Sequence, residues 1–565
     1  MGKKLTLKET KTLLKQKTLM FTSWNCEYPE RYMHQNFYLP IKELFGDVIL
    51  WDPKKRLIKY GPTEMKRQLI EAIKEKNPDF ILFTVWGCGD FESIDLIKEF
   101  RKASPNSKII GFYADDDRDF EISSRFYAPF IDYNIVVQPD FTDEYIKEGN
   151  KAYSFYVVDT KNYTPLNLEK KYDVSFIGTP SPSRLEVMRV LMNEGIKIEL
   201  WGRGWLEYPE FRDVYHGEVN REDFNKIISQ TKVNLGFIKN QEGKPHFKAR
   251  VLENAALKTF TLIDYFEGYK LFFEEDKEIV MFKDTKDLID KIKYYLENEK
   301  ERESIAEKAY ERVAKDLDII ERLIVIFKDI FEEEETFKPR MGWKLDEKVI
   351  KLRGDNLKLS SEELKDLVKN YNYITFQTSE TKEFDKKEYF QIYSLQKTNK
   401  DISLSSYYIG SSGMGHIMRF RPFHAFTNLR KEYFDKLVNI DAVMVKKDYF
   451  VNNAEKFKEV FDGGIINFIN DENTIFVDIP LFRTDNVNKG IISTINVLGT
   501  EAFAKAFQPN FAMKIYSRMH EKKLLGDPYI YKLLWSSLFG GNISILKYLY
   551  QAYHNKSNWD KLQRL

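Results

Sequence analysis

Short apolar runs alternate with longer amphipathic stretches from Thr18 to about Ile330. Ten of these runs have the length and the β-branched or aromatic content of buried strands. The stretches between them repeat apolar residues at helical spacing. Strands and helices that alternate in this way form parallel sheets with helices on both faces, so this region is predicted to hold two doubly wound α/β domains. The predicted strands are TLMFTSW, DVILW, DFILFTVW, KIIGFYA, YNIVV, AYSFYVV, YDVSFIG, KIELWG, KVNLGFI and FTLIDY, and the predicted helices include Thr63–Glu75, Ser93–Ala103, Ser183–Glu194 and Arg221–Ser229.

Two charged, proline-bearing segments indicate domain boundaries. Residues Lys161–Lys171 combine Asn-Tyr-Thr-Pro-Leu-Asn with a charged Glu-Lys-Lys, which is typical of a connector between domains. A second boundary is expected after the predicted helices Thr285–Glu297 and Glu301 to about Glu332, where an acidic run meets Lys338-Pro339-Arg340. The chain is therefore expected to divide into residues 1–165, residues 166–335 and an accessory module over residues 340–565.

The composition narrows the class of protein. Of 565 residues, 43% are hydrophobic and 31% are charged, which fits a folded globular protein. The 88 lysines and arginines balance 87 aspartates and glutamates, so the net charge of +1 creates no field that would attract nucleic acid. No apolar run reaches the roughly 20 residues that a transmembrane helix needs. With only Cys26 and Cys88 as cysteines, a cytoplasmic protein with reduced thiols is expected.

Polar residues directly follow several strands of the first predicted sheet. Ligands of open parallel sheets bind beyond the carboxyl ends of the strands, so these positions are informative. The triplet Asp115–Asp117 follows KIIGFYA and could cap the next helix, contact a polar substrate or bind a metal. We expect no metal here, and we expect Asp116 to make a catalytic or acceptor contact. The residues expected to contact the acceptor or the sugar are Trp24, Asn25, Trp86, Gly87 and Asp115.

The second predicted sheet carries glycine turns at the same edge. Gly178 ends YDVSFIG and opens a turn of small residues before a helix, where free backbone N–H groups can bind a phosphate. Arg203 lies in a similar turn after KIELWG. Each turn taken alone also fits plain tight-turn geometry. Tyr215-His216-Gly217 resembles a further turn of this kind, and three such turns on one sheet edge favour a binding site there.

The densest group of candidate residues is Lys244–Ala256. Lys248 and Arg250 bring cations to the start of a helix, which suits a diphosphate, and Glu253 lies one turn further, which suits a ribose diol. A surface pair between Arg250 and Glu253 is the alternative. The residues expected to bind the donor nucleotide or its diphosphate are Gly178, Thr179, Arg203, His246, Lys248, Arg250 and Glu253.

The block KARVLENAALKTFTLIDYFEGYKLFFEEDKEIVMF resembles CgeB-type glycosyltransferases, the family named for a spore maturation protein. In that family an arginine and a glutamate lead a helix of small residues, a strand ends in Thr-Asp-Tyr or similar, and an apolar segment precedes Glu-Ile or Glu-Leu. The matching positions here are Arg250, Glu253, Asp264-Tyr265, Leu271-Phe272-Phe273 and Glu278-Ile279. The resemblance extends upstream through YDVSFIGTPSPSR to GFYADDD and covers about residues 18–330.

This resemblance implies a GT-B fold, in which two Rossmann-like domains face each other across a cleft. The second domain would hold most of the nucleotide-sugar donor, and the first would hold most of the acceptor. Glu253 would bind the donor ribose, while Lys248, Arg250 and the Gly178-Thr179 turn would face the diphosphate. Pro245 departs from the wider Glu-x7-Glu signature of retaining relatives, which puts the sugar contact and the stereochemical outcome in doubt.

The implied activity is metal-independent transfer of a sugar from a nucleoside diphosphate sugar to a cell-envelope glycan, a glycoprotein or a similar acceptor. The enzyme would be of the hexosyltransferase type and would need no cofactor besides this co-substrate. The alternative is a non-catalytic scaffold that binds a nucleotide sugar or a glycan and uses the C-terminal module for protein interaction. The reasons for keeping this alternative are Pro245, in place of the first glutamate, and the absence of an Asp-x-Asp motif.

The C-terminal module is expected to be α+β or mainly helical. The stretch YNYITFQTSETKEFDKKEYFQIYSLQK faintly resembles the middle of a GT-A, family 2 glycosyltransferase. At the metal-binding turn of that family this chain has Gln377-Thr378-Ser379-Glu380, without the paired aspartates, so the module would be degenerate. An aromatic-rich amphipathic helix over residues 529–553 suits core packing, homo-oligomer formation or acceptor docking equally well.

Overall fold

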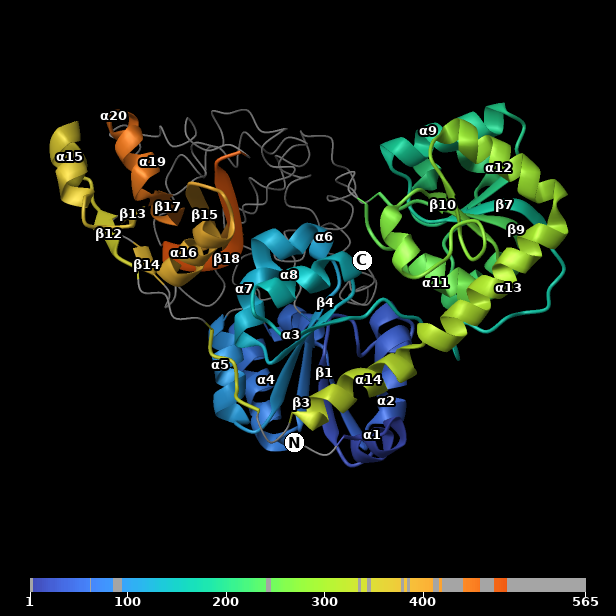
Figure 1. Ribbon diagram of the computed structural model, residues 1–565, viewed down its shortest axis with the longest axis horizontal. Coiled ribbons are helices and arrows are strands. Elements are labelled where there is room, and N and C mark those ends of the chain that lie inside the picture. Colours follow the sequence, from blue (N-terminus) through green and yellow to red (C-terminus); the bar gives the residue numbers. More distant parts are fainter. Residues whose placement is uncertain are drawn as a thin grey trace, which may run out of the picture.

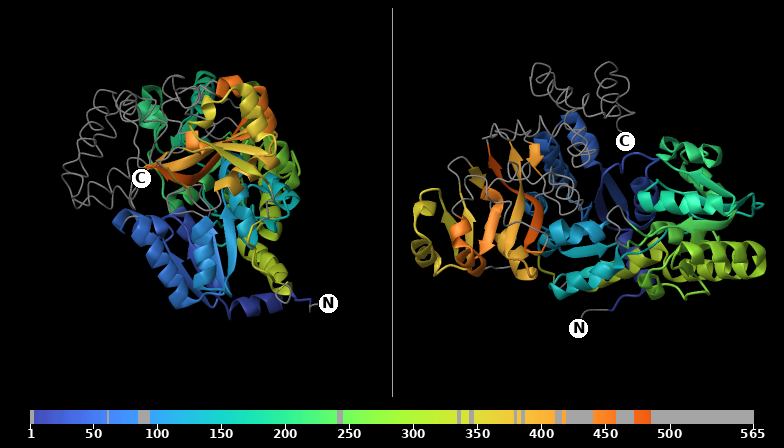
Figure 2. Two further views of the ribbon diagram at one scale, coloured as in Figure 1. Left: turned by 90° about the vertical axis from the view of Figure 1, so that its left-hand side faces the viewer. Right: turned by 90° about the horizontal axis from the view of Figure 1, so that it is seen from above.

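Three β-sheets organise the molecule, and each is built from its own stretch of the chain (Figure 1). The domain around the first sheet lies between the other two, as the views in Figures 1 and 2 agree. The computed structural model describes residues 4–60, 62–84, 94–239, 245–333, 337–342, 347–377, 381–383, 387–409, 416–418, 440–457 and 472–484.

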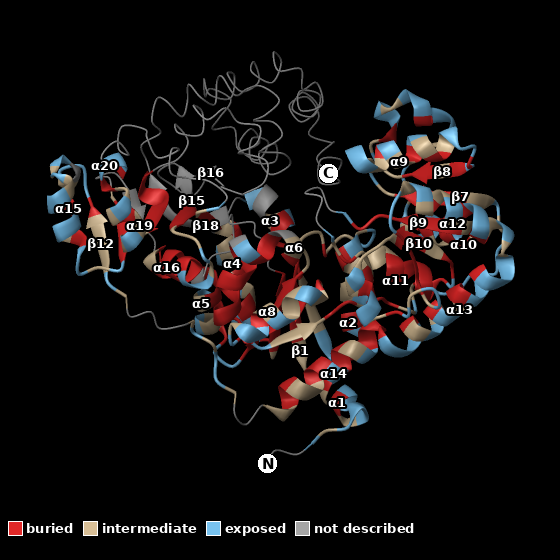
Figure 3. Ribbon diagram, turned by 45° about the horizontal axis from the view of Figure 1, so that its top comes forward, coloured by how far each residue is buried: buried red, intermediate tan, exposed pale blue. Residues whose placement is uncertain are grey.

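The first sheet has six parallel strands in the order β2-β1-β3-β4-β5-β6. Because β2 and β3 lie on opposite sides of β1, the chain changes direction between β1 and β3, which is where open sheets bind ligands. Apolar cores cover both faces of the sheet. Figure 3 shows buried positions on helices around it, such as α4 (Pro62–Lys76) and α14 (Ile319–Glu332). The strands are β1 (Thr18–Thr22), β2 (Asp47–Trp51), β3 (Phe80–Thr84), β4 (Lys108–Tyr113), β5 (Tyr133–Val136) and β6 (Ala152–Ser154).

Helices on the two faces of this sheet connect its strands. The longest, α4, begins at a proline, which suits a first helical position because its missing N–H would have no partner there. A π-helix over His34–Tyr38 leads into α2. The α-helices are α1 (Leu7–Leu14), α2 (Leu39–Leu44), α3 (Pro53–Tyr60), α4 (Pro62–Lys76), α5 (Ile94–Ala103), α6 (Asp116–Asp119), α7 (Arg125–Tyr127) and α8 (Thr142–Lys147).

The second sheet has five parallel strands in the order β11-β10-β9-β7-β8. Its first strand lies between its second and third strands, so the direction changes between β7 and β9. Apolar cores again cover both faces. The elements are β7 (Tyr172–Ile177), α9 (Pro182–Asn193), β8 (Ile198–Trp201), α10 (Arg221–Ser229), β9 (Thr231–Gly236), α11 (Ala249–Ala256), β10 (Thr261–Asp264), β11 (Val280–Phe282), α12 (Thr285–Glu297) and α13 (Glu299–Asp316).

The single helix predicted from Glu301 to about Glu332 is wrong, because the structure has two helices there, α13 and α14 (Ile319–Glu332). The break occurs at Asp318, whose side chain accepts hydrogen bonds from the N–H groups of Ile320 and Glu321 and so caps α14. The buried face of α14 packs into the core of the first sheet, although this segment was predicted to belong with the second.

The third sheet is mixed and follows the order β12-β13-β17-β15-β18-β14, with β16 paired to β15. Helix α16 docks it onto the first domain through Tyr389, Phe390 and Tyr393, which join one of the first domain's cores. The elements are β12 (Val349–Leu352), α15 (Ser361–Val368), β13 (Tyr373–Phe376), β14 (Thr381–Glu383), α16 (Lys387–Lys397), β15 (Ile402–Ile409), β16 (His416–Met418), β17 (Val443–Lys446), α19 (Lys447–Asn452), α20 (Ala454–Phe457) and β18 (Thr474–Thr484).

The predicted fold class is confirmed: two Rossmann-like domains in a GT-B arrangement precede an α+β module. All ten predicted strands are present as β1 to β10, whereas β11 was not predicted. Within the described part of the chain, no helix combines the length and the apolar character that crossing a membrane requires. The predicted helix over residues 529–553 lies outside the described residues.

Candidate functional site

The first and second domains meet through loops at the carboxyl ends of their strands. Gln138, two residues after β5, accepts a hydrogen bond from the Phe247 N–H at 3.0 Å, and its Nε2 donates to the Phe247 carbonyl at 3.3 Å. The same amide nitrogen lies 3.2 Å from His246 Nε2. Because this nitrogen is a donor, His246 Nε2 must accept, and the proton of the neutral imidazole is on Nδ1.

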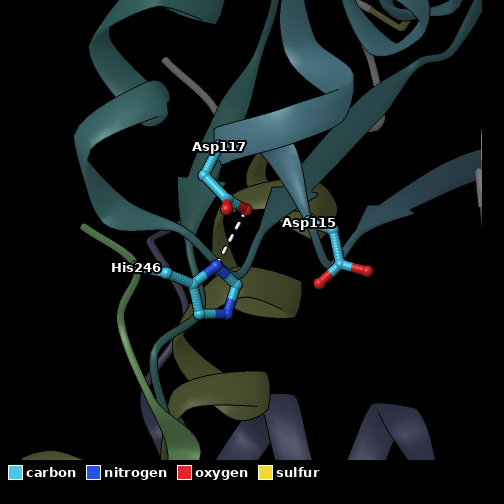
Figure 4. Close-up of side chains that lie close together, drawn as sticks. All are labelled: Asp115, Asp117 and His246. Carbon is cyan, nitrogen blue, oxygen red and sulfur yellow. Dashed lines mark ion pairs between the residues drawn. The ribbon is translucent and has the colours of Figure 1, made fainter. Parts of the chain in front are cut away.

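The Nδ1 atom lies close to an aspartate of the first domain (Figure 4). His246 Nδ1 lies 2.8 Å from Asp117 Oδ1, an ion pair when the imidazole is protonated. Asp115 lies beside this pair in Figure 4, and ligand atoms of the three side chains are within 4.8 Å of one another. Two carboxylates and an imidazole at this spacing could hold a metal ion. The prediction that the site holds no metal can therefore be tested at these three side chains.

Lys248 ends the same segment and is the N-cap residue of α11. Its backbone N–H donates to Tyr269 Oη at 3.1 Å, and its carbonyl accepts a hydrogen bond from Tyr156 at 2.8 Å. Burial, with Arg184 nearby, lowers the pKa of the Lys248 ammonium to about 8, while Asp117 acts in the opposite direction. The Lys248 ammonium and the start of α11 would both interact favourably with a diphosphate at this position.

Arg184 is a second cation of this edge, which the sequence prediction missed. It lies in the first turn of α9 and donates from Nη1 to the Thr179 carbonyl at 2.9 Å. Burial lowers the pKa of its guanidinium, and the carboxyl of Asp264 opposes that shift. The signal was present in the sequence, because Arg184 stands in the first helical turn after Gly178 and Thr179, as Arg250 does after Lys248.

The two glycine turns after β7 and β8 pack against each other. The Gly178 carbonyl accepts a hydrogen bond from Trp205 Nε1 at 2.7 Å. Gly202 has a φ of +116°, and a Cβ there would lie 2.4 Å from Gly178 O, so this contact requires glycine. Arg203 is exposed and pairs with Glu218 at 3.4 Å. Among the described residues, no recorded contact joins it to the other predicted donor residues.

Glu253 is buried in α11 and held from two sides. Tyr163 donates to Glu253 Oε1 at 3.1 Å, and Arg250 Nε lies 3.4 Å from Glu253 Oε2. The Arg250 guanidinium also lies over the ring of Phe224, 4.3 Å from its centroid. The pair between Arg250 and Glu253 that the sequence offered as an alternative is thus present, but its carboxylate is buried rather than on the surface. Ribose binding by Glu253 stays a prediction.

The three consecutive aspartates of the first domain point in different directions. Asp116 is only 1% exposed and accepts a hydrogen bond from Tyr145 at 2.9 Å, so it faces the interior. Burial raises its pKa to about 7. Asp115 occupies the N-cap position of α6 but makes no capping hydrogen bond. Asp115 and Asp117 therefore face the second domain, and the catalytic role expected for Asp116 stays a prediction.

The predicted acceptor contacts lie partly within the described residues. Trp24 and Asn25 follow β1 and are half-buried, and the Lys54 ammonium lies 5.6 Å from the centroid of the Trp24 ring. Asn25 has a φ of 59°, in the left-handed region that asparagine tolerates better than most residues. Trp86 and Gly87 lie outside the described residues, so their predicted role has no structural counterpart here.

Residues 184–327 match a family model described as glycosyl transferase-like. This match covers most of the second domain, including α9, α11 and the cations at their starts. A search of curated proteins found no match. Residues 184–327 of the second domain are thus similar to glycosyl transferases by sequence.

Solved structures similar to this chain include glycosyltransferases. Anabaena Alr3699/HepE in complex with UDP and glucose has 10% identity, covers 57% of this chain and 99% of its own, and gives a TM-score of 0.40. Sucrose-phosphate synthase from Thermosynechococcus elongatus has 12% identity, covers 56% of this chain and 99% of its own, and gives a TM-score of 0.41. A glycosyltransferase from Rickettsia africae has 13% identity, covers 56% of this chain and 98% of its own, and gives a TM-score of 0.41. At such low identities, the chemistry of this chain has to be argued from its own residues.

Proposed function

We propose that the protein is a glycosyltransferase that moves a sugar from a nucleoside diphosphate sugar to a cell-envelope glycan, a glycoprotein or a similar acceptor. The observation that carries this proposal is the pair of half-buried cations, Lys248 and Arg184, at the carboxyl edge of the second sheet. Both belong to helices that start at this edge, within or beside the segment that matches the glycosyl transferase-like model.

The chemistry expected of these groups is stabilisation of the leaving diphosphate. Charge develops on the diphosphate as the bond to the sugar breaks, and fixed cations in a partly dry site stabilise that charge. The N-terminus of α11 adds free backbone N–H groups. The proposal includes transfer without a metal ion, because Lys248 and Arg184 already supply two positive charges. It also includes a CgeB-like specificity, a hexose donor and action in the cytoplasm.

The first domain would present the acceptor. Its edge brings Asp115 and Asp117 toward the second domain, where His246 meets Asp117. Carboxylates can accept hydrogen bonds from acceptor hydroxyl groups and can take a proton from them. The position of these aspartates across from Lys248 supports a reaction between two substrates held by different domains.

Donor hydrolysis and nucleotide binding across UDP, GDP, dTDP and CMP sugars test the proposal. Lys248→Met should weaken binding of the matching nucleoside diphosphate by about tenfold or more, since it removes a charge-assisted contact. Arg189→Met is the matched control, because Arg189 is an exposed cation of the same domain that pairs with Glu210. The absence of both turnover and nucleotide binding at millimolar concentration would refute the proposal.

A further inference from the structure

Several buried oxygen atoms at the carboxyl edge of the first sheet lack a hydrogen-bond partner among the described residues, and three of them lie on neighbouring strands. These three are Ser23 Oγ, Asp52 Oδ2 and Thr84 Oγ1. None of the three residues exposes more than 1% of its surface. A buried polar atom without a partner loses the hydrogen bonds it had with water, so most such atoms in folded proteins are paired. Three of them at one edge call for a ligand that supplies the missing partners.

Strand register places these residues side by side. Thr22 ends β1 and pairs with the last residue of β2 and with the next-to-last residue of β3. Ser23, Asp52 and Thr84 each come one residue later, so they form a row on three neighbouring strands and share one face of the sheet. We call this set the Ser23–Asp52–Thr84 row. It crosses the point between β1 and β3 where the chain changes direction and where open sheets bind ligands.

The row offers a defined set of hydrogen-bonding groups. Asp52 Oδ1 is already used, because it accepts the backbone N–H groups of Lys54 at 2.9 Å and Lys55 at 3.2 Å at the start of α3. Its Oδ2 remains as an acceptor. The two hydroxyl groups of the row can each donate and accept. A carboxylate beside two hydroxyls disfavours a phosphate and suits neighbouring hydroxyl groups of a neutral ligand.

Two further observations agree with a carbohydrate. Burial raises the pKa of Asp52 to about 6, and the Glu27 carboxylate acts in the same direction. A hydrogen bond donated by a ligand hydroxyl to Oδ2 would relieve part of that desolvation. Trp24 directly follows Ser23 and is half-buried, and aromatic side chains of this kind present an apolar face that suits a sugar ring.

We propose that the Ser23–Asp52–Thr84 row is an acceptor subsite that binds adjacent hydroxyl groups of a carbohydrate. This inference rests on the proposed function, because it names the part of the first domain that holds the acceptor of glycosyl transfer. It adds three residues to the acceptor contacts expected from the sequence. Asp52 Oδ2 accepts a hydrogen bond from one sugar hydroxyl, and the Ser23 and Thr84 hydroxyl groups bond its neighbours.

The test measures binding of methyl glycosides of glucose, galactose, mannose and N-acetylglucosamine to the full chain by saturation-transfer NMR. Ser23→Ala and Thr84→Val should each weaken the best-bound glycoside by about fivefold to tenfold, the value of one buried hydrogen bond. Thr22→Val is the matched control, since Thr22 also has a buried hydroxyl without a partner but lies on the opposite face of β1. It should leave the dissociation constant unchanged.

Thermal unfolding without sugar separates binding from a structural role. Thr84→Val removes a hydroxyl that has no protein partner, so the melting temperature should stay the same or rise. A row that holds only structural water would instead show a lower melting temperature and unchanged sugar affinity, which overturns the inference. Absence of binding by all four glycosides also overturns it.

Calorimetry with nucleoside diphosphates on the same samples keeps this inference distinct from the proposed function. Nucleotide binding without sugar binding refutes the row and leaves the glycosyltransferase proposal standing. Sugar binding that depends on Ser23 and Thr84, without any nucleotide binding, supports the row and refutes the proposed activity.

Discussion

The affinity for a nucleoside diphosphate should fall as the pH rises above about 8, because Lys248 loses its proton there. Burial and Arg184 lower the pKa of Lys248 to about 8, and only the protonated form, present below that value, offers charge to a diphosphate. Between about pH 7 and about pH 9.5 its charged fraction falls from roughly nine-tenths to about one-thirtieth. The dissociation constant should therefore rise over this range by up to about 30-fold, with the affinity of Lys248→Gln as the limit at high pH.

Isothermal titration calorimetry at constant ionic strength measures this profile, with the nucleotide that binds best. Lys248→Arg keeps its charge throughout the range and should give a nearly flat profile. Lys248→Gln lacks the charge at every pH, so its binding should be weak and equally flat. Other titrating groups are common to all three proteins, so the difference between profiles isolates Lys248. A wild-type slope equal to that of Lys248→Gln would refute the reasoning.

Three further predictions concern stability, metal and nucleotide. Asp132→Ala should lower the free energy of unfolding by about 3 kcal/mol in urea titrations, because it removes a buried carboxylate that binds the half-buried Arg101 through both oxygens at 2.8 and 3.0 Å; an unchanged midpoint would contradict this. Transfer should persist in excess EDTA, whereas loss of transfer that Mn²⁺ restores would assign an ion to Asp115, Asp117 and His246. Glu253→Gln should weaken nucleotide binding about tenfold in calorimetry, and an unchanged affinity would show that Glu253 only braces α11.

The strands of the first two domains could be predicted because both faces of each sheet are buried, which leaves continuous apolar runs. Most of the helices could be predicted because the apolar residues of their buried faces recur at helical spacing. The break at Asp318 was missed because residues on both sides favour a helix, so only the capping bonds to Ile320 and Glu321 reveal it. Strand β11 was missed because it lies in an apolar run of only four residues, Ile279–Phe282, whereas the equally short β6 lies in the longer run AYSFYVV.

The candidate site could be predicted only as far as single strand ends allow. The rule that ligands lie beyond the strands selected Asp115, and the cations at the start of a helix selected Lys248. The Asp115 carboxylate is close enough to Lys248 to raise its pKa. Applied to the second strand, the same rule would have selected Asp52, which directly follows β2. The contact between His246 and Asp117 could not be predicted, because it depends on how two domains pack and not on either sheet alone.

Acidic and basic groups are sorted between the two facing edges, although the net charge of the chain is only +1. The first domain brings Asp115 and Asp117, and the second brings Lys248 and Arg184. The two carboxylates raise the pKa of Lys248, which is also what the phosphates of a donor would do. A diphosphate bound at Lys248 would therefore face like charge on the first domain. Because like charges repel most strongly at short range, this arrangement favours the neutral sugar, rather than a phosphate, in the space nearest Asp115 and Asp117.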